Sequence, residues 1–138
     1  MRIWEEYIKA VETGQRNAGR LEHLAVKHVK KLATQYDFDT EEADRVLSIV
    51  SYMKYPTGKW KGHRFDLMPH QAFFIAYLFG LMNKDGNRLI REAMLNMAKK
   101  GGKSALDAVI GVLFTFFDGE QTAEGYVVAN KTDQTLFC

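Results

Sequence analysis

The feature that most constrains the fold is the junction at residues 98–104, where an apolar run gives way to two glycines, a lysine and a serine. Residues 93–97 are mostly apolar, as in a buried parallel strand, and residues 104–114 change to the apolar spacing of a helix. Glycines in such a loop let backbone N–H groups approach an anion, and the following helix adds the positive end of its dipole. The junction therefore predicts a phosphate-binding loop in an α/β fold.

The polar residues of this loop have predicted roles. In a P-loop, the lysine reaches the β- and γ-phosphates of a nucleoside triphosphate, and the hydroxyl residue after it binds Mg²⁺. Lys103 and Ser104 occupy these two places. The full pattern G-x-x-x-x-G-K-[ST] is not met, because Met97 replaces the first glycine. An ordinary basic turn between a strand and a helix is the alternative. The residues expected to bind nucleotide at the loop are Lys100, Gly101, Gly102, Lys103 and Ser104.

Composition narrows the class of protein. The chain has 138 residues, 46% of them hydrophobic, which is enough for one small domain with a real core. Its net charge of +2 does not by itself argue for nucleic acid. The single cysteine, Cys138, excludes a disulfide framework and favours a reducing setting. The four histidines lack ligand-like spacing, and neither a signal peptide nor a membrane span is expected.

Five helices are expected from the apolar spacing. Residues 2–12 and about 18–35 form the first two, and a third follows a cap at Asp39 or Thr40. Pro69 suits the first turn of the fourth helix, and the fifth covers residues 104–117. Residues 83–86, Asn-Lys-Asp-Gly, predict a turn.

The second helix has a basic face. Lys27, Lys30 and Lys31 are expected on its solvent side. We interpret this face as solvated surface, with a DNA contact as the alternative. The residues expected to face the core are Leu21, Leu24, Ala25, Val29 and Leu32.

The segment 59–68 mixes aromatic and basic residues without a sustained period. It is interpreted as a surface linker near the nucleotide site, in which Trp60 and Phe65 dock on the core. Contact with a single-stranded nucleic acid is the alternative, because aromatic and basic side chains serve that purpose as well.

Strands are expected at residues 88–97 and 124–129, on either side of the fifth helix. A strand, a crossover helix and a second strand form a βαβ unit with parallel strands. The predicted fold class is therefore α/β: a partial P-loop NTPase-like βαβ core preceded by an α-helical extension. Residues 1–54 would form the helical N-terminal region, and residues 55–138 the first part of the ATPase domain.

Four stretches in order resemble the large subunit of the terminase, the ATP-driven DNA-packaging motor and nuclease of tailed bacteriophages. Residues 38–47 resemble the helix before the motor core, and residues 58–74 the segment that carries the family's adenine-recognising glutamine. Residues 91–104 resemble its deviant Walker A, and residues 129–134 the segment after the second strand.

The resemblance implies roles for further residues. Gln71 would read the adenine of ATP, with Phe65 or Tyr55 as stacking partners. Lys99 stands where the family holds an arginine that senses the γ-phosphate; lysine keeps the charge but loses the two-pronged guanidinium. Residues 130–134 would connect nucleotide state to DNA.

The resemblance also implies partners and a setting: ATP, Mg²⁺, double-stranded DNA moved into a procapsid, the small terminase subunit, the portal, and the cytoplasm of a bacterial host. Self-association is also expected. No Walker B motif or nuclease metal cluster follows Gln134, so the chain is expected to be the front part of a longer motor, inactive in hydrolysis by itself. The alternatives are a fragment of a helicase-like nucleic-acid-dependent ATPase and a non-catalytic module that binds the small terminase subunit.

Overall fold

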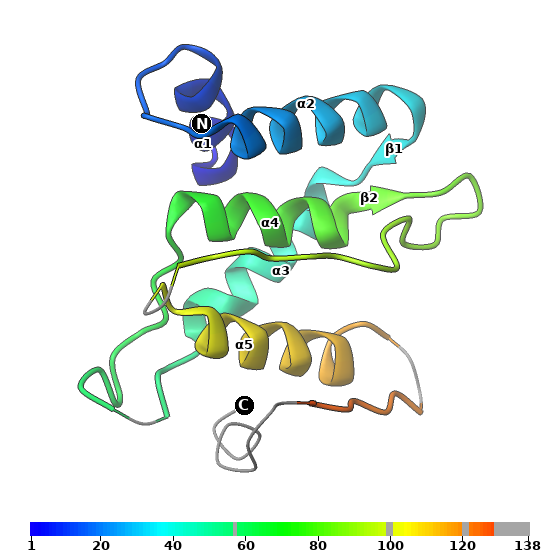
Figure 1. Cartoon of the computed structure of the whole chain (residues 1–138). Coiled ribbons are helices and arrows are strands. Elements are labelled where there is room, and N and C mark those ends of the chain that lie inside the picture. The colour runs from blue at the N-terminus through cyan, green and yellow to red at the C-terminus, as the bar shows by residue number, and fades with distance from the viewer. Residues whose placement is uncertain (57, 99–100, 120–121, 129–138) are drawn as a thin grey trace. The chain divides into compact units, whose positions relative to one another are not determined.

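The computed structural model describes residues 1–56, 58–98, 101–119 and 122–128 (Figure 1). Within these ranges, no helix is long and apolar enough to cross a membrane. The elements that the described residues form are α1 (Ile3–Glu12), α2 (Arg20–Gln35), β1 (Asp37–Phe38), α3 (Thr40–Tyr52), α4 (Pro69–Gly80), β2 (Leu81–Met82) and α5 (Lys103–Phe116).

The chain divides into two compact units. Unit 1 comprises Met1–Met53 and Arg64–Ala93, and unit 2 comprises Lys54–His63 and Met94–Cys138. The chain first passes from unit 1 to unit 2 after Met53, next to the domain boundary predicted from the sequence between residues 54 and 55. That domain boundary stays a prediction. Each unit is built from two stretches of chain.

Helix α4 is the centre of unit 1. It begins with Pro69 in the first turn, as predicted, and its residues from Gln71 to Gly80 are buried except for the half-buried Phe74. It packs against both α1 and α3 (Figure 1). A helix that is apolar all round needs such cover, because no face of it is suited to water.

Aromatic side chains join three elements of unit 1. The ring of Trp4 on α1 lies 5.3 Å from that of Phe38 and 5.8 Å from that of Tyr77, centroid to centroid. Phe73 extends the cluster, 5.2 Å from Tyr77 and 5.0 Å from Tyr7. Edge-on and tilted pairs at these distances add to the free energy gained from burial. The cluster therefore fixes α1 and β1 against α4.

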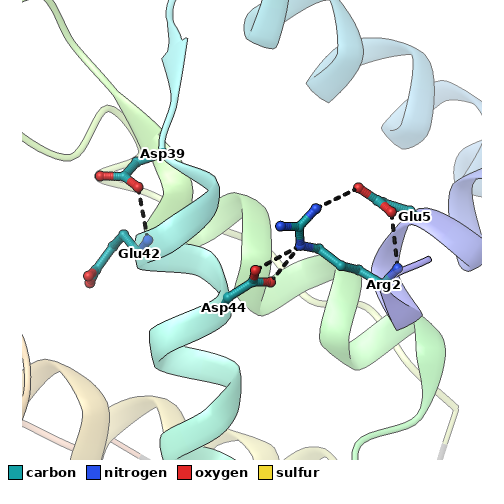
Figure 2. A network of polar contacts seen from close by, with 5 residues as sticks. All are labelled: Arg2, Glu5, Asp39, Glu42 and Asp44. Carbon is teal, nitrogen blue, oxygen red and sulfur yellow. Dashed lines mark hydrogen bonds and ion pairs between the residues drawn. The ribbon is translucent and has the colours of Figure 1, made fainter.

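Helix α3 begins at the predicted cap and is tied to α1 (Figure 2). The side chain of Asp39 accepts a hydrogen bond from the backbone N–H of Glu42 at 2.9 Å. The Arg2 guanidinium donates from Nε to both carboxylate oxygens of Asp44, at 2.9 and 2.7 Å, and also pairs with Glu5. The hydrogen bonds that Arg2 donates to Glu5 lower the pKa of the Glu5 carboxyl, and the bond from the Arg2 backbone N–H contributes most.

A short antiparallel sheet holds the start of α3 to the end of α4. Asp37 pairs with Met82 and Phe38 with Leu81, a pairing that the sequence did not predict. The predicted turn follows: the N–H of Asn83 donates to the carbonyl of Asn87 at 2.7 Å. Asn83 Oδ1 also accepts from two backbone N–H groups of the turn, so this part of the sequence prediction is confirmed.

The predicted inward face of α2 is right for Val29 and Leu32 and wrong for Leu21, Leu24 and Ala25. Val26 is buried, and Val29, Leu32 and Ala33 pack partly against the core, whereas Leu21 is 73% and Leu24 49% exposed. Ala25 is exposed as well. The helix is turned because Glu22 faces inward, where its Oε1 accepts a hydrogen bond from Tyr7 Oη at 3.0 Å.

The predicted βαβ unit is only partly found. Helix α5 forms as expected, but residues 89–98 and 122–128 contain no strand. The predicted parallel pairing is therefore absent from the described residues, and Met94 and Val128 are 89% and 92% exposed. A strand exists only when its N–H and C=O groups pair with a neighbour, and apolar composition alone does not supply one.

The linker prediction is half right. Phe65 is buried in unit 1. Trp60 is 57% exposed in unit 2, with Lys59 Nζ 5.4 Å from the centre of its ring. It sits on a closed turn, in which the N–H of Gly62 donates to the carbonyl of Tyr55 at 2.9 Å. Trp60 is therefore presented to solvent and does not dock on a core.

Candidate nucleotide-binding site

The loop before α5 has the backbone shape that its glycines suggested. The N–H of Gly101 donates to the carbonyl of Ala98 at 3.1 Å, which closes a turn. Gly102 then adopts the left-handed conformation, with φ 79° and ψ 16°, directly before the first helical residue, Lys103. This conformation costs a residue with a side chain about 1–2 kcal/mol, so glycine is required here. Successive amides in such turns form concave anion sites.

Gly101 lies close to its neighbours. A Cβ atom there would lie 3.1 Å from the Ala98 carbonyl oxygen and 3.1 Å from Met97 Cε, so these atoms would have to shift slightly to admit a side chain. Met97, the residue that replaces the first glycine of the P-loop pattern, thus packs against this glycine.

The N-terminus of α5 supplies the other half of an anion site. The helical hydrogen bonds begin with the N–H of Leu106, which donates to the carbonyl of Gly102 at 3.0 Å. The N–H groups of the preceding turn lie outside this ladder and point along the axis, where the dipole is positive. Lys103 and Ser104 are both exposed at this end.

These donors fit a magnesium nucleotide. Backbone N–H groups, an ammonium group and a hydroxyl are the groups that bind phosphate oxygens and complete the coordination of Mg²⁺. Lys103 would hold phosphate, Ser104 would offer its hydroxyl to the metal, and Gly101 leaves the space that a Cβ would fill. The bound nucleotide would supply the phosphoryl group for transfer. The described residues contain no group of three or more His, Cys, Asp or Glu side chains suited to a metal.

Gln71 is placed in unit 1, at the third residue of α4. It is 4% exposed, and its Oε1 accepts a hydrogen bond from the backbone N–H of Met68 at 2.9 Å. This is one arm of a capping box, in which a side chain at the third position of a helix reaches back to the residue before it. Gln71 therefore has a structural role that the sequence reading missed, because the N-cap residue Met68 is not one of the usual capping residues.

The predicted stacking partners differ in exposure. Phe65 is 5% exposed, so its ring is committed to the core of unit 1. Tyr55 is half-buried in unit 2. Beside Gln71, burial lowers the pKa of the His70 imidazole, with a further contribution from the Arg16 charge.

Some predicted residues lie outside the described part of the chain. Lys99, the proposed charge sensor, and Lys100 belong to this group, as do residues 129–134. The structure therefore brings together Gly101, Gly102, Lys103 and Ser104 of the predicted site.

A groove of about 470 Å³ lies elsewhere on unit 2. Residues of α5 from Asp107 onward and residues 123–127 line it, including Val112, Thr115, Phe116 and Tyr126. None of the loop glycines, Lys103 or Ser104 contributes to it. This groove is therefore distinct from the phosphate loop.

One family model matches the chain. It is that of the terminase large subunit, ATPase domain, and it covers residues 69–137, half of the sequence. The match begins at the first residue of α4 and includes the phosphate loop and all of α5. No curated protein and no solved structure matches the chain significantly. On the order of its motifs, the shape of its loop and this match, the chain belongs to the family of the terminase large subunit ATPase domain.

Proposed function

We propose that this chain is the ATP-binding segment of a phage terminase large subunit, the motor that packages double-stranded DNA into procapsids. Lys103 binds the β- and γ-phosphates of ATP, and the Ser104 hydroxyl binds Mg²⁺. Gly101, Gly102 and Lys100 line the phosphates. The observation that carries the proposal is the left-handed Gly102 before α5, within the stretch that the family model matches.

The charge arrangement supports this assignment. An ATP tail carries several negative charges, and the loop offers a helix N-terminus together with the exposed ammonium group of Lys103. Among the described acidic residues, the nearest along the chain to Lys103 are Asp107 on α5 and Glu92 before the loop. An anion is therefore the ligand that this end of α5 suits.

The first test replaces Lys103 with alanine. We expect ATP affinity to fall about 10-fold or more, because a charge-assisted hydrogen bond to a phosphate is worth about 1.5–3 kcal/mol. Isothermal titration calorimetry with Mg-ATP measures the loss, and Lys84→Ala, in the turn after β2, is the matched control. Equal affinities of the Lys103 variant and the unmodified chain would reject the phosphate site.

Lys99 has a different proposed role. As a charge sensor it acts on the transition state, so Lys99→Ala is expected to leave ATP affinity close to that of the unmodified chain. If Lys99→Ala and Lys103→Ala lowered ATP affinity equally, this division of roles would be wrong.

Gln71 is proposed to read the adenine base, and its role in the cap calls for a careful choice of variant. In Gln71→Glu the carboxylate still accepts the Met68 N–H, whereas the amide N–H₂ donor is lost. We expect this variant to keep the cap hydrogen bond and to lose part of its preference for ATP over GTP, and its buried carboxylate should lower its thermal stability at neutral pH. Gln71→Ala should lose both, with about 1 kcal/mol from the cap. An unchanged preference in Gln71→Glu would leave Gln71 with its structural role alone.

Binding to the small terminase subunit and to the portal belongs to the same proposal and is supported by family membership, and self-association of the chain is proposed as well. A helicase-like ATPase would share the nucleotide site. A non-catalytic module would not bind Mg-ATP at all, so the calorimetric titration separates it from both motors.

A further inference from the structure

We propose that the solvent face of α2 is a contact surface for the phosphate backbone of a nucleic-acid duplex. The choice of double-stranded DNA as the duplex rests on the proposed function, and the rest of the proposal does not. The surface is defined by the five side chains of α2 that carry or can carry positive charge on this face, Arg20, His23, Lys27, Lys30 and Lys31, and is called the α2 cationic face below.

The orientation of α2 about its own axis exposes this face. Val26 is 2% exposed and points to the core, whereas all five members of the α2 cationic face are exposed. At about 100° per residue, the five lie within an arc of about 100° on the side away from the core residues Val29 and Ala33. The sequence predicted Lys27, Lys30 and Lys31 on the solvent side, and the structure adds Arg20 and His23 to the same exposed face.

The face lacks negative charge of its own. Glu22 is the single acidic residue of α2, and its carboxylate is turned toward Tyr7 Oη and the backbone N–H of Gly19. Glu12, on the neighbouring helix α1, pairs with Lys30 at 2.5 Å. Within the described residues, no ion pair neutralises Arg20, Lys27 or Lys31. A surface that keeps three uncompensated cations in a row suits a partner with a row of anions.

The spacing fits a phosphate backbone. Along α2, Arg20 and Lys27 are about 10 Å apart and Lys27 and Lys31 about 6 Å, at 1.5 Å per residue. These distances correspond to roughly two to three nucleotide rises of about 3.4 Å along one strand. Helix α2 lies at the edge of unit 1, so that a rigid extended partner can lie along it (Figure 1).

A membrane surface suits α2 less well than a duplex does. A helix that lies in a membrane interface buries a broad apolar face there. In α2 the residues of that face, Val26 and its neighbours Val29 and Ala33, already pack in unit 1. Outside the core contact, α2 exposes Leu21, Leu24 and Ala25, but most of its exposed residues are polar or basic, which favours electrostatic contact with phosphates.

The test measures binding of the full chain to a fluorescent duplex of about 20 base pairs, by anisotropy at about 50 and 200 mM salt. The variant is Lys27→Gln with Lys31→Gln. We expect its affinity at the lower salt to fall about 10-fold or more, and the slope of log K against log salt to lose about 1.8 in magnitude, because each phosphate contact contributes about 0.9. The variant Lys27→Arg with Lys31→Arg should bind as the unmodified chain does.

The control removes the same charge elsewhere in unit 1, by Lys9→Gln with Lys84→Gln, and is expected to change affinity much less. Equal losses in the two Gln variants, or none in the Lys27 and Lys31 pair, would overturn the proposal. Preference for polyglutamate over the duplex would overturn it in favour of an acidic protein partner. Circular dichroism confirms that the variants fold. Mg-ATP affinity, measured in parallel, should stay unchanged, so failure here is distinct from failure of the nucleotide site.

Discussion

At the scale of single residues, the carboxylate of Glu22 makes several contacts that stabilise unit 1. Its carboxylate accepts hydrogen bonds from Tyr7 Oη at 3.0 Å, from the Gly19 N–H at 2.9 Å and from Arg16 Nε at 3.4 Å. The Arg16 guanidinium also lies 5.5 Å from the centre of the Tyr7 ring. These contacts, the Gly19 hydrogen bond foremost, hold the pKa of Glu22 below its usual value. One carboxylate thus starts α2 and joins it to α1.

The same contact predicts a dependence of stability on alkaline pH. Burial, and then the hydrogen bond to Glu22, raise the pKa of Tyr7 from 10.0 to about 12. The folded state therefore holds this proton more tightly than the unfolded state, and the associated stability is intact below pH 10 and lost as the pH rises toward 12. In urea titrations, Tyr7→Phe should lose less unfolding free energy over this range than the unmodified chain. Parallel losses in the two proteins would show that Tyr7 keeps an ordinary pKa when folded.

At the scale of elements, two helical glycines predict opposite effects. A Cβ atom on Gly80, at the end of α4, would lie 2.8 Å from the Phe38 ring and 3.1 Å from the Asp39 carbonyl oxygen. We expect Gly80→Ala to destabilise unit 1 by about 1–3 kcal/mol through overpacking. Gly111 on α5 has no such neighbour within 4 Å, so Gly111→Ala should stabilise its helix by up to about 1 kcal/mol.

Thermal unfolding followed by circular dichroism compares these two variants, and amide hydrogen exchange assigns each change to α4 or α5. A stabilising Gly80→Ala would mean that the Phe38 ring can move aside without cost. The sequence shows only that both positions are glycines within helices. The opposite signs follow from what each one touches.

The helices could be read from the sequence, but their faces could not always be. In α1 the apolar set is compact, and Trp4, Tyr7, Ile8 and Val11 are all buried, whereas Ile3 of the same set is 39% exposed. In α2, apolar residues occur on two sides, and periodicity alone cannot choose between them. The choice depends on Glu22, whose inward position follows from Tyr7 on another helix.

The strands illustrate a second limit. Residues 93–97 have the composition of a buried strand, yet a strand also needs a pairing partner, which no local pattern encodes. The short β1–β2 ladder shows the reverse case: Phe38 and Leu81 pair although two residues are too few for any period-2 signal. At the loop, the sequence predicted only that the glycines free the backbone, and the structure identifies Gly102 as the residue that uses this freedom by adopting the left-handed conformation.

At the scale of the whole molecule, the division into units follows packing more closely than chain order. Helix α4 follows the linker in sequence, but it is buried by α1 and α3, which precede the linker. A domain boundary placed at residue 54 from composition cannot show that α4 packs with the helices before the linker. The apolar sequence of α4 does not indicate which helices cover it. The phosphate loop and α5 lie in the other unit.

Residues 54–63 form an excursion from unit 1, that is, a loop whose flanking residues in unit 1 are hydrogen-bonded to each other. The N–H of Phe65 donates to the carbonyl of Met53 at 2.9 Å, so the two ends of the excursion are held together within unit 1. Lys59 and Lys61 on it are exposed and accessible to trypsin. After cleavage there, we expect the two polypeptides to co-elute in gel filtration and to separate only in denaturant. Separation under native conditions would show that the packing of α4 needs the intact chain.

We therefore expect the covalent link through this turn to be dispensable for holding α1, α2 and α3 against α4. Cut at Lys59 or Lys61, the chain becomes a pair of complementary fragments, neither of which can bury its apolar surface without the other. Expressed as two separate polypeptides, they should reassemble spontaneously, which makes the turn a natural site for splitting the protein or for inserting a reporter.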